Sequence, residues 1–171
     1  MRLALAVLLF AASLALAGEE RKLDLGGGRT LSYTLVEPGD DLPSATGTAR
    51  EILRLLAAGD IDQAAAHSNA PAGRAEVLRD FRDRVGEEEF RRVFERFTAP
   101  QNVLLAEVAI GDHRLLVWHL GEPAERLAGQ YYVEVAGRFV MDDVPNETRA
   151  NLRRVLQAYR RMGAKASGRT D

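Results

Sequence analysis

The sequence predicts one α+β domain whose N-terminal helices pack on an antiparallel sheet, and two observations indicate this arrangement. Apolar residues recur at helical spacing through residues 48–97, as in helices buried on one face. From residue 101 to residue 142 they instead alternate with polar residues, as in half-buried strands. The 171 residues of the chain are enough for one domain with a substantial core.

Residues 1–17 have the pattern of a cleavable signal peptide. Arg2 precedes an apolar run that ends in Ala15-Leu16-Ala17, the small residues that a signal peptidase accepts. The run is shorter than the ~20 apolar residues that span a bilayer. We therefore expect cleavage after Ala17 and a periplasmic or secreted protein, with a retained membrane anchor as the alternative.

The composition excludes several classes of site and partner. Cysteine is absent, which excludes disulfides, thiolate metal sites and lipid attachment to an N-terminal cysteine. The 23 Lys and Arg residues nearly balance 25 Asp and Glu, so neither nucleic acid nor, after signal cleavage, a membrane is expected as a partner. His67, His113 and His119 lack metal-ligand spacing, so no metal and no cofactor is predicted.

Residues 18–45 are predicted to form a β-hairpin and a linker ahead of the main domain. Apolar and polar residues alternate on both sides of Gly26-Gly27-Gly28, and glycines permit the positive φ angles of a tight turn. The stretch 37–44 is rich in proline, glycine and acidic residues, which is typical of a connection.

Helix signals follow in residues 46–97. Thr48 and Glu51 have the spacing of a capping box, and Gly59 is placed to end the first helix. Asp60 is expected to cap a second helix. Helical spacing then continues on both sides of Gly86, which predicts a kink or a join between two helices.

Two hairpins and a last helix complete the predicted elements. The strands 101–110 and 113–120 meet at Gly111-Asp112, and the strands 127–135 and 138–142 meet at Ala136-Gly137. The C-terminal helix occupies residues 144–163, with Asn146 as its cap and Gly163 at its end. Residues 164–171 are expected to be a disordered tail.

Two passages in this order resemble one superfamily. EILRLLAAGDIDQAAA at residues 51–66 and QYYVEVAGRFVMD at residues 130–142 are similar to the opening helices and closing hairpin of the nuclear-transport-factor-2-like superfamily, over residues 46–143. The resemblance implies a cone-shaped α+β fold in which a curved antiparallel sheet encloses a pocket. Its members include ketosteroid-isomerase-like and dehydratase-like enzymes, polyketide cyclases and non-catalytic binding modules. The N-terminal hairpin and C-terminal helix are additions to that pattern.

Hairpin geometry predicts which residues line such a pocket. A two-residue loop fixes the partners across each hairpin, which pairs Leu104 with His119 and Tyr131 with Asp142. We expect the valine-rich faces to turn inward, although a register error of one residue would reverse that assignment. The predicted ligand-binding residues are Leu115, Val117, His119, Tyr131 and Asp142.

The opposite face of the predicted sheet carries more apolar surface than is usually left in water. This favours a homodimer formed through the sheet. The residues predicted at that interface are Leu105, Leu116, Trp118, Tyr132 and Phe139.

These observations favour an exported, non-catalytic module that binds a small apolar ligand or an envelope protein. One alternative is an isomerase, dehydratase or cyclase with a desolvated Asp142, a proton-exchanging His119 and Tyr131 as donor to a developing oxyanion. Another alternative is an envelope inhibitor or immunity-type protein. No motif commits the sequence to a reaction, so catalysis is the less favoured interpretation.

Overall fold

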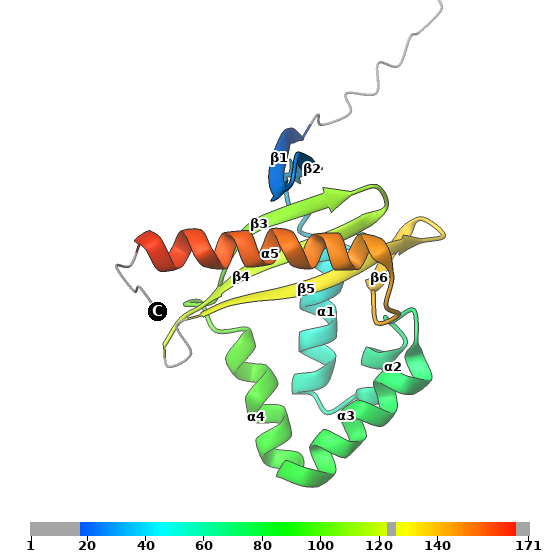
Figure 1. Ribbon diagram of the computed structural model, residues 1–171. Coiled ribbons are helices and arrows are strands. Elements are labelled where there is room, and N and C mark those ends of the chain that lie inside the picture. Colours follow the sequence, from blue (N-terminus) through cyan, green and yellow to red (C-terminus); the bar gives the residue numbers. More distant parts are fainter. Residues whose placement is uncertain (1–17, 123–125, 167–171) are drawn as a thin grey trace, which may run out of the picture.

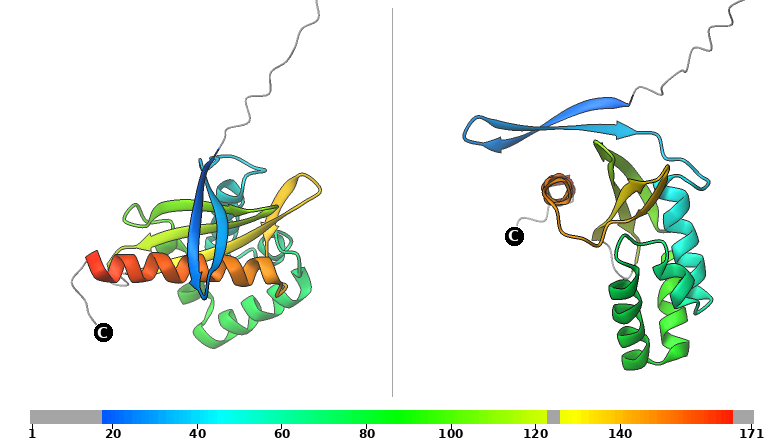
Figure 2. Two further views of the ribbon diagram at one scale, coloured as in Figure 1. Left: turned by 45° about the horizontal axis from the view of Figure 1, so that its top comes forward. Right: turned by 90° about the vertical axis from the view of Figure 1, so that its right-hand side faces the viewer.

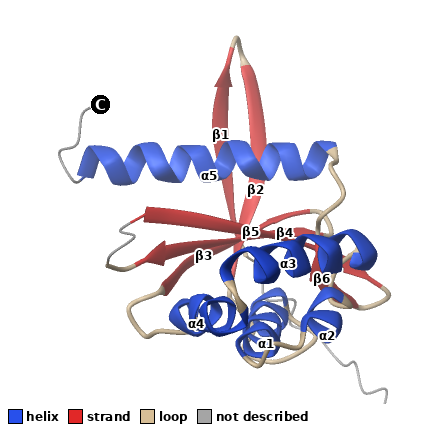
Figure 3. Ribbon diagram, turned by 90° about the horizontal axis from the view of Figure 1, so that it is seen from below, coloured by secondary structure: helices blue, strands red, loops and turns tan. Residues whose placement is uncertain are grey.

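The computed structural model describes residues 18–122 and 126–166, the last three by their backbone alone. The predicted signal peptide lies outside these residues. The structure has the predicted α+β class and three layers (Figures 1 and 3). An antiparallel sheet lies between a group of helices on one face and a single helix on the other.

The described chain forms a hairpin, four helices, four strands and a last helix. The strands are β1 (Glu19–Gly26), β2 (Arg29–Val36), β3 (Val103–Ile110), β4 (His113–Leu120), β5 (Arg126–Val135) and β6 (Arg138–Met141). The helices are α1 (Ala45–Ala57), α2 (Ile61–Ala65), α3 (Pro71–Val85), α4 (Glu87–Phe97) and α5 (Glu147–Ala166).

The described strands form one sheet in the order β1-β2-β3-β4-β5-β6, so each lies beside its neighbours in sequence. The turn between β5 and β6 is the predicted two-residue turn, with positive φ at Ala136 (51°) and Gly137 (77°). Strand β6 is short and pairs with β5 over residues 132–135. No strand of the described chain covers that side of residues 126–130, which form an unpaired edge.

The register of the β3–β4 hairpin differs from the prediction at its far end. Ile110 lies opposite His113 as expected, but the register shifts between Leu104 and Ala106. Beyond this bulge, Leu104 lies opposite Trp118. The predicted pairing of Leu104 with His119 was wrong, because one extra residue in a strand turns the following side chains to the other face.

The β1–β2 hairpin joins the sheet but extends well beyond it (Figure 2). Strand β2 forms an antiparallel pair with β3, in which residues 34–36 lie opposite residues 109–107. In the right-hand view of Figure 2, α5 is seen end-on in the angle between the hairpin and the rest of the sheet. Leu23, Leu31 and Tyr33 of the hairpin pack on the core formed by α5 and the sheet.

The other face of the sheet is covered by α1 to α4. Helix α1 lies on the sheet, and α3 and α4 form a V beneath it (Figure 1). Gly86 joins α3 to α4 with φ at 86°, in agreement with the predicted join. The aromatic rings of α3 pack against those of α4. The ring centres of Phe90 and Phe94 are 4.9 Å apart.

The start of α1 was predicted four residues too late. The Ser44 hydroxyl caps this helix by accepting a hydrogen bond from the N–H of Gly47 at 2.9 Å. Thr48 is therefore inside the helix, where its hydroxyl donates to the Phe139 carbonyl at 3.1 Å. The capping-box prediction was wrong because a serine one turn earlier already satisfies the free amides. Asp60 caps α2 as predicted.

Helix α5 packs on the valine-rich face of the sheet. Its cap is Asn146, as predicted, which accepts from the N–H of Arg149 at 2.7 Å. Close packing depends on Gly129, because a side chain there would approach Leu156 to 2.6 Å. The helix continues through Gly163 to Ala166, so the predicted end was wrong: one glycine costs a helix only about 1 kcal/mol. Residues 167–171 of the predicted tail lie outside the described chain.

The two sheet faces are used differently from the prediction. The face that was expected to form a dimer interface packs on the helical layer of the same chain. Leu116 and Tyr132 are fully buried there, and Trp118 and Phe139 pack against the same core. Among the five predicted interface residues, Leu105 alone is exposed, at 51%. Helices cover both faces of the sheet, so the side chains packed under the helical layer are unavailable to a second chain, and the homodimer stays a prediction.

A buried carboxyl group lies under the start of α1. Glu107 is 5% exposed and accepts a hydrogen bond from the Thr46 hydroxyl at 3.0 Å. The Nε atom of Arg114 is 3.7 Å from its other oxygen. Burial raises the pKa of Glu107, although the Thr46 hydrogen bond and the charge of Arg114 act in the opposite direction.

Replacing Leu152 with alanine should lower the free energy of unfolding by about 2–5 kcal/mol, because its side chain is fully buried between α5 and the sheet. The exposed neighbour Arg153 provides the control, since Arg153→Ala should change stability by less than about 0.5 kcal/mol. Urea denaturation measures both variants. Equal effects would contradict the packing of α5 on the sheet.

Glu107 should make stability fall as the pH rises. Its raised pKa means that the folded protein retains a proton that the unfolded chain has released, so stability decreases between the ordinary pKa near 4.5 and the raised value. Glu107→Gln lacks this titration. Its unfolding free energy, measured by urea denaturation, should therefore improve relative to the wild type as the pH rises above the ordinary carboxyl pKa near 4.5. A difference independent of pH would contradict this.

Candidate functional site

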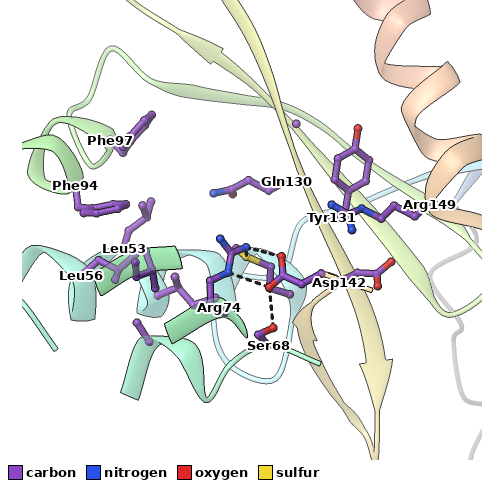
Figure 4. Close-up of a pocket in the computed structure, with 16 residues that line it drawn as sticks. Leu53, Leu56, Ser68, Arg74, Phe94, Phe97, Gln130, Tyr131, Asp142 and Arg149 are labelled. Atoms are coloured by element: carbon purple, nitrogen blue, oxygen red, sulfur yellow. Dashed lines mark hydrogen bonds and ion pairs between the residues drawn. The ribbon is translucent and has the colours of Figure 1, made fainter. Parts of the chain in front are cut away.

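A pocket of about 390 Å³ lies at the unpaired edge of β5 (Figure 4). Small-molecule sites typically have volumes of about 300–1,000 Å³. Residues 129–131 of β5 form one side of the pocket, because β6 is too short to cover them. The other sides come from α1, α3 and α4 on one face of the sheet, from the end of β6, and from the start of α5 on the other face. The pocket therefore lies where the two helical layers meet around the edge of the sheet.

One end of the pocket is apolar. Leu53 and Leu56 of α1 face Phe94 and Phe97 of α4 across it (Figure 4). Phenylalanine recurs in α4 at intervals of three and four residues, which places these rings on one helical face. The ring centres of Phe94 and Phe97 are 6.3 Å apart. This end provides a surface for an apolar group.

The other end contains a closed ion pair. Arg74 of α3 donates to both carboxylate oxygens of Asp143, from Nε at 2.9 Å and from Nη2 at 2.7 Å. The Ser68 hydroxyl also donates to Asp143 at 2.7 Å. Because both charges are matched within this group, it fixes α3 to the end of the sheet without a net charge.

Tyr132 lies close to this ion pair but cannot act as a donor to the pocket. Its side chain is fully buried, and the hydroxyl has no hydrogen-bond partner within the described residues. Burial raises the pKa of Tyr132, the charge of Arg74 lowers it and that of Asp143 raises it. The phenol therefore remains neutral and belongs to the core.

Asp142 joins three segments at the rim of the pocket. Its carboxylate is 1% exposed and accepts from the side-chain amides of Asn69 at 2.8 Å and Asn146 at 2.9 Å. Its backbone N–H donates to the Tyr131 carbonyl at 2.8 Å. His113 Nε2 lies 3.6 Å from the same carboxylate. The group thus holds the α2–α3 loop and the start of α5 against β5.

Arg149 and Gln130 bring further donors to the pocket. The Arg149 guanidinium lies over the Tyr131 ring at 5.3 Å from its centre. Gln130 accepts from the Trp118 indole N–H at 3.0 Å through Oε1, which leaves its NH₂ group for other contacts. Both side chains line the pocket (Figure 4).

The structure brings together two of the three polar residues that were predicted to meet. Tyr131 and Asp142 line the pocket, but His119 is exposed and lies near the far end of β4. It is six positions along β4, about 20 Å, from His113, the histidine that does approach Asp142. The predicted grouping of His119 with Asp142 was wrong, because β5 places the start of β4, and not its end, level with β6 on its other side.

Leu115 and Val117 were also predicted to bind ligand. Both are fully buried beneath α5 and are not among the residues lining this pocket. The helix that covers them had been predicted as an addition outside the main domain. Their assignment to the pocket was wrong because α5 occupies the inward face of the sheet.

Several pocket residues were not identified from the sequence. The helical spacing of Phe94 and Phe97 predicted a buried face, but not that part of this face would border a pocket. Arg149 follows the Asn146 cap by three residues, which places it in the first turn of α5. That signal locates Arg149 on the helix without indicating what the first turn faces.

Comparison with known proteins does not identify a family. No family model, curated protein or solved structure matches the chain. The resemblance to the nuclear-transport-factor-2-like superfamily therefore stays a prediction. Across residues 18–122 and 126–166, no helix is long and apolar enough to cross a membrane. Within the same ranges, no group of three or more His, Cys, Asp or Glu side chains is arranged to hold a metal.

Asp142→Ala should destabilise the protein by about 2 kcal/mol or more, because it leaves the amides of Asn69 and Asn146 without their acceptor. Asp40→Ala is the control, since that exposed carboxylate forms a surface ion pair with Arg50 that contributes about 0–1 kcal/mol. Thermal and urea denaturation compare the two. A loss at Asp142 no larger than that at Asp40 would show that the buried network contributes little.

Proposed function

We propose that this chain is an exported, non-catalytic module that binds a small apolar ligand at the unpaired edge of β5. The main support is the pocket of about 390 Å³, whose apolar end is formed by Leu53, Leu56, Phe94 and Phe97. Export is proposed from the signal-peptide pattern of residues 1–17.

The hydrogen bonds of Asp142 favour binding over catalysis. Each carboxylate oxygen accepts from an asparagine amide, a group that does not exchange protons in the physiological range. His119, the proposed proton carrier, lies elsewhere on β4. His113 approaches Asp142 but is not among the residues that line the pocket. The isomerase, dehydratase or cyclase alternative therefore lacks the arrangement that it requires.

An uncharged fluorescent probe, N-phenyl-1-naphthylamine, should bind the protein with increased emission. Leu53→Gln should weaken this binding roughly tenfold, because it replaces an apolar part of the pocket wall with an amide. Fluorescence titration gives the dissociation constants. Bound probe should also raise the melting temperature, since binding to the folded state alone stabilises it.

Met162→Gln is the matched control for Leu53→Gln. Met162 is a 56% exposed apolar residue of α5, and it does not line the pocket, so its replacement should leave probe affinity unchanged. Absence of saturable probe binding to the wild-type protein would refute the proposed function. Equal losses in the two variants would show that the probe binds at another surface.

A further inference from the structure

Arg149 differs from the other charged residues of the pocket because its guanidinium forms no hydrogen bond or ion pair within residues 18–122 and 126–166. The Asp143 carboxylate accepts three hydrogen bonds, from Nε and Nη2 of Arg74 and from the Ser68 hydroxyl. Asp142 accepts one at each oxygen. The Arg149 guanidinium, in contrast, has no acceptor within the described chain, and its Nε atom is fully buried.

The position of this guanidinium is set by the protein itself. Asn146 holds the backbone of Arg149 in the first turn of α5, with an N–H to Oδ1 distance of 2.7 Å. The Tyr131 ring supports one side of the guanidinium at 5.3 Å. In Figure 4 the side chain extends from α5 toward the pocket, on the opposite side from Arg74. A guanidinium held in this way retains its two terminal NH₂ groups as donors for an acceptor that enters the pocket.

The neighbouring groups on β5 are also donors. Gln130 has its oxygen occupied by Trp118, which leaves the NH₂ group. The Tyr131 carbonyl accepts from the Asp142 N–H on the β6 side of the strand, so alternation along the strand directs both the N–H and the carbonyl of Gly129 to the unpaired edge. The pocket therefore combines the side-chain donors of Arg149 and Gln130 beside β5 with an apolar end at α1 and α4.

We propose that the ligand is a small amphipathic carboxylate whose acid group binds Arg149 and whose apolar body lies between α1 and α4. This inference rests on the proposed function, because it names the class of ligand for the same pocket. Carboxylate is favoured because its two oxygens match the guanidinium fork. An uncharged ligand would leave the guanidinium without a direct hydrogen-bond acceptor of opposite charge, and a cationic one would be repelled by it.

Displacement of N-phenyl-1-naphthylamine by a matched pair of competitors tests the proposal. Decanoate and decanol share an apolar chain and differ in the charged head group. At neutral pH and low salt, decanoate should displace the probe from the wild-type protein at concentrations roughly tenfold or more below those of decanol. In Arg149→Gln this preference should disappear, so that the displacing concentrations of decanoate and decanol become equal within about twofold.

Arg153→Gln is the control, because it removes the same charge from an exposed position one turn further along α5. It should retain the preference for decanoate. Equal displacement by decanoate and decanol in the wild-type protein would overturn the carboxylate inference but not the proposed function. A preference that persists in Arg149→Gln would overturn the role of Arg149. Failure of the probe to bind the wild-type protein would instead refute the proposed function.

Discussion

The buried carboxylate of Asp142 is the constraint on which the arrangement of the layers depends. It lies at the end of β6 and binds the amides of Asn69, in the loop between α2 and α3, and of Asn146, at the start of α5. A charge removed from water is stable only where donors replace the lost hydration. The need to satisfy one aspartate therefore fixes both helical layers to the same end of the sheet.

Local patterns were sufficient to predict most of the elements but not how the sheet is covered. Three predictions depended only on neighbours in sequence: the strands within residues 101–142, the turn at Ala136-Gly137 and the Asn146 cap. The structure contains all three. Which face meets which helix depends on distant contacts. Both faces of this sheet are buried, so alternation could not distinguish an inner face from an outer one.

The candidate site shows the same limit more strongly. Its location depends on the length of β6, because this short strand leaves the outer edge of half of β5 unpaired. It also depends on two helical layers that approach this edge from opposite sides. Tyr131 and Asp142 were identified because hairpin pairing is local. Leu53, Phe97 and Arg149 were not, since they come from three helices that are far apart in sequence.

The small junction between the β1–β2 hairpin and the body has a consequence for cooperativity. Backbone pairing to β3 involves residues 34–36, whereas the two strands of the hairpin pair with each other from Glu19 to Leu35. Separating it from the body breaks few backbone hydrogen bonds and does not disturb the contacts around Asp142. Leu23, Leu31 and Tyr33 also pack on the core formed by α5 and the sheet, so the hairpin is held to the body mainly by side-chain packing rather than by backbone hydrogen bonds.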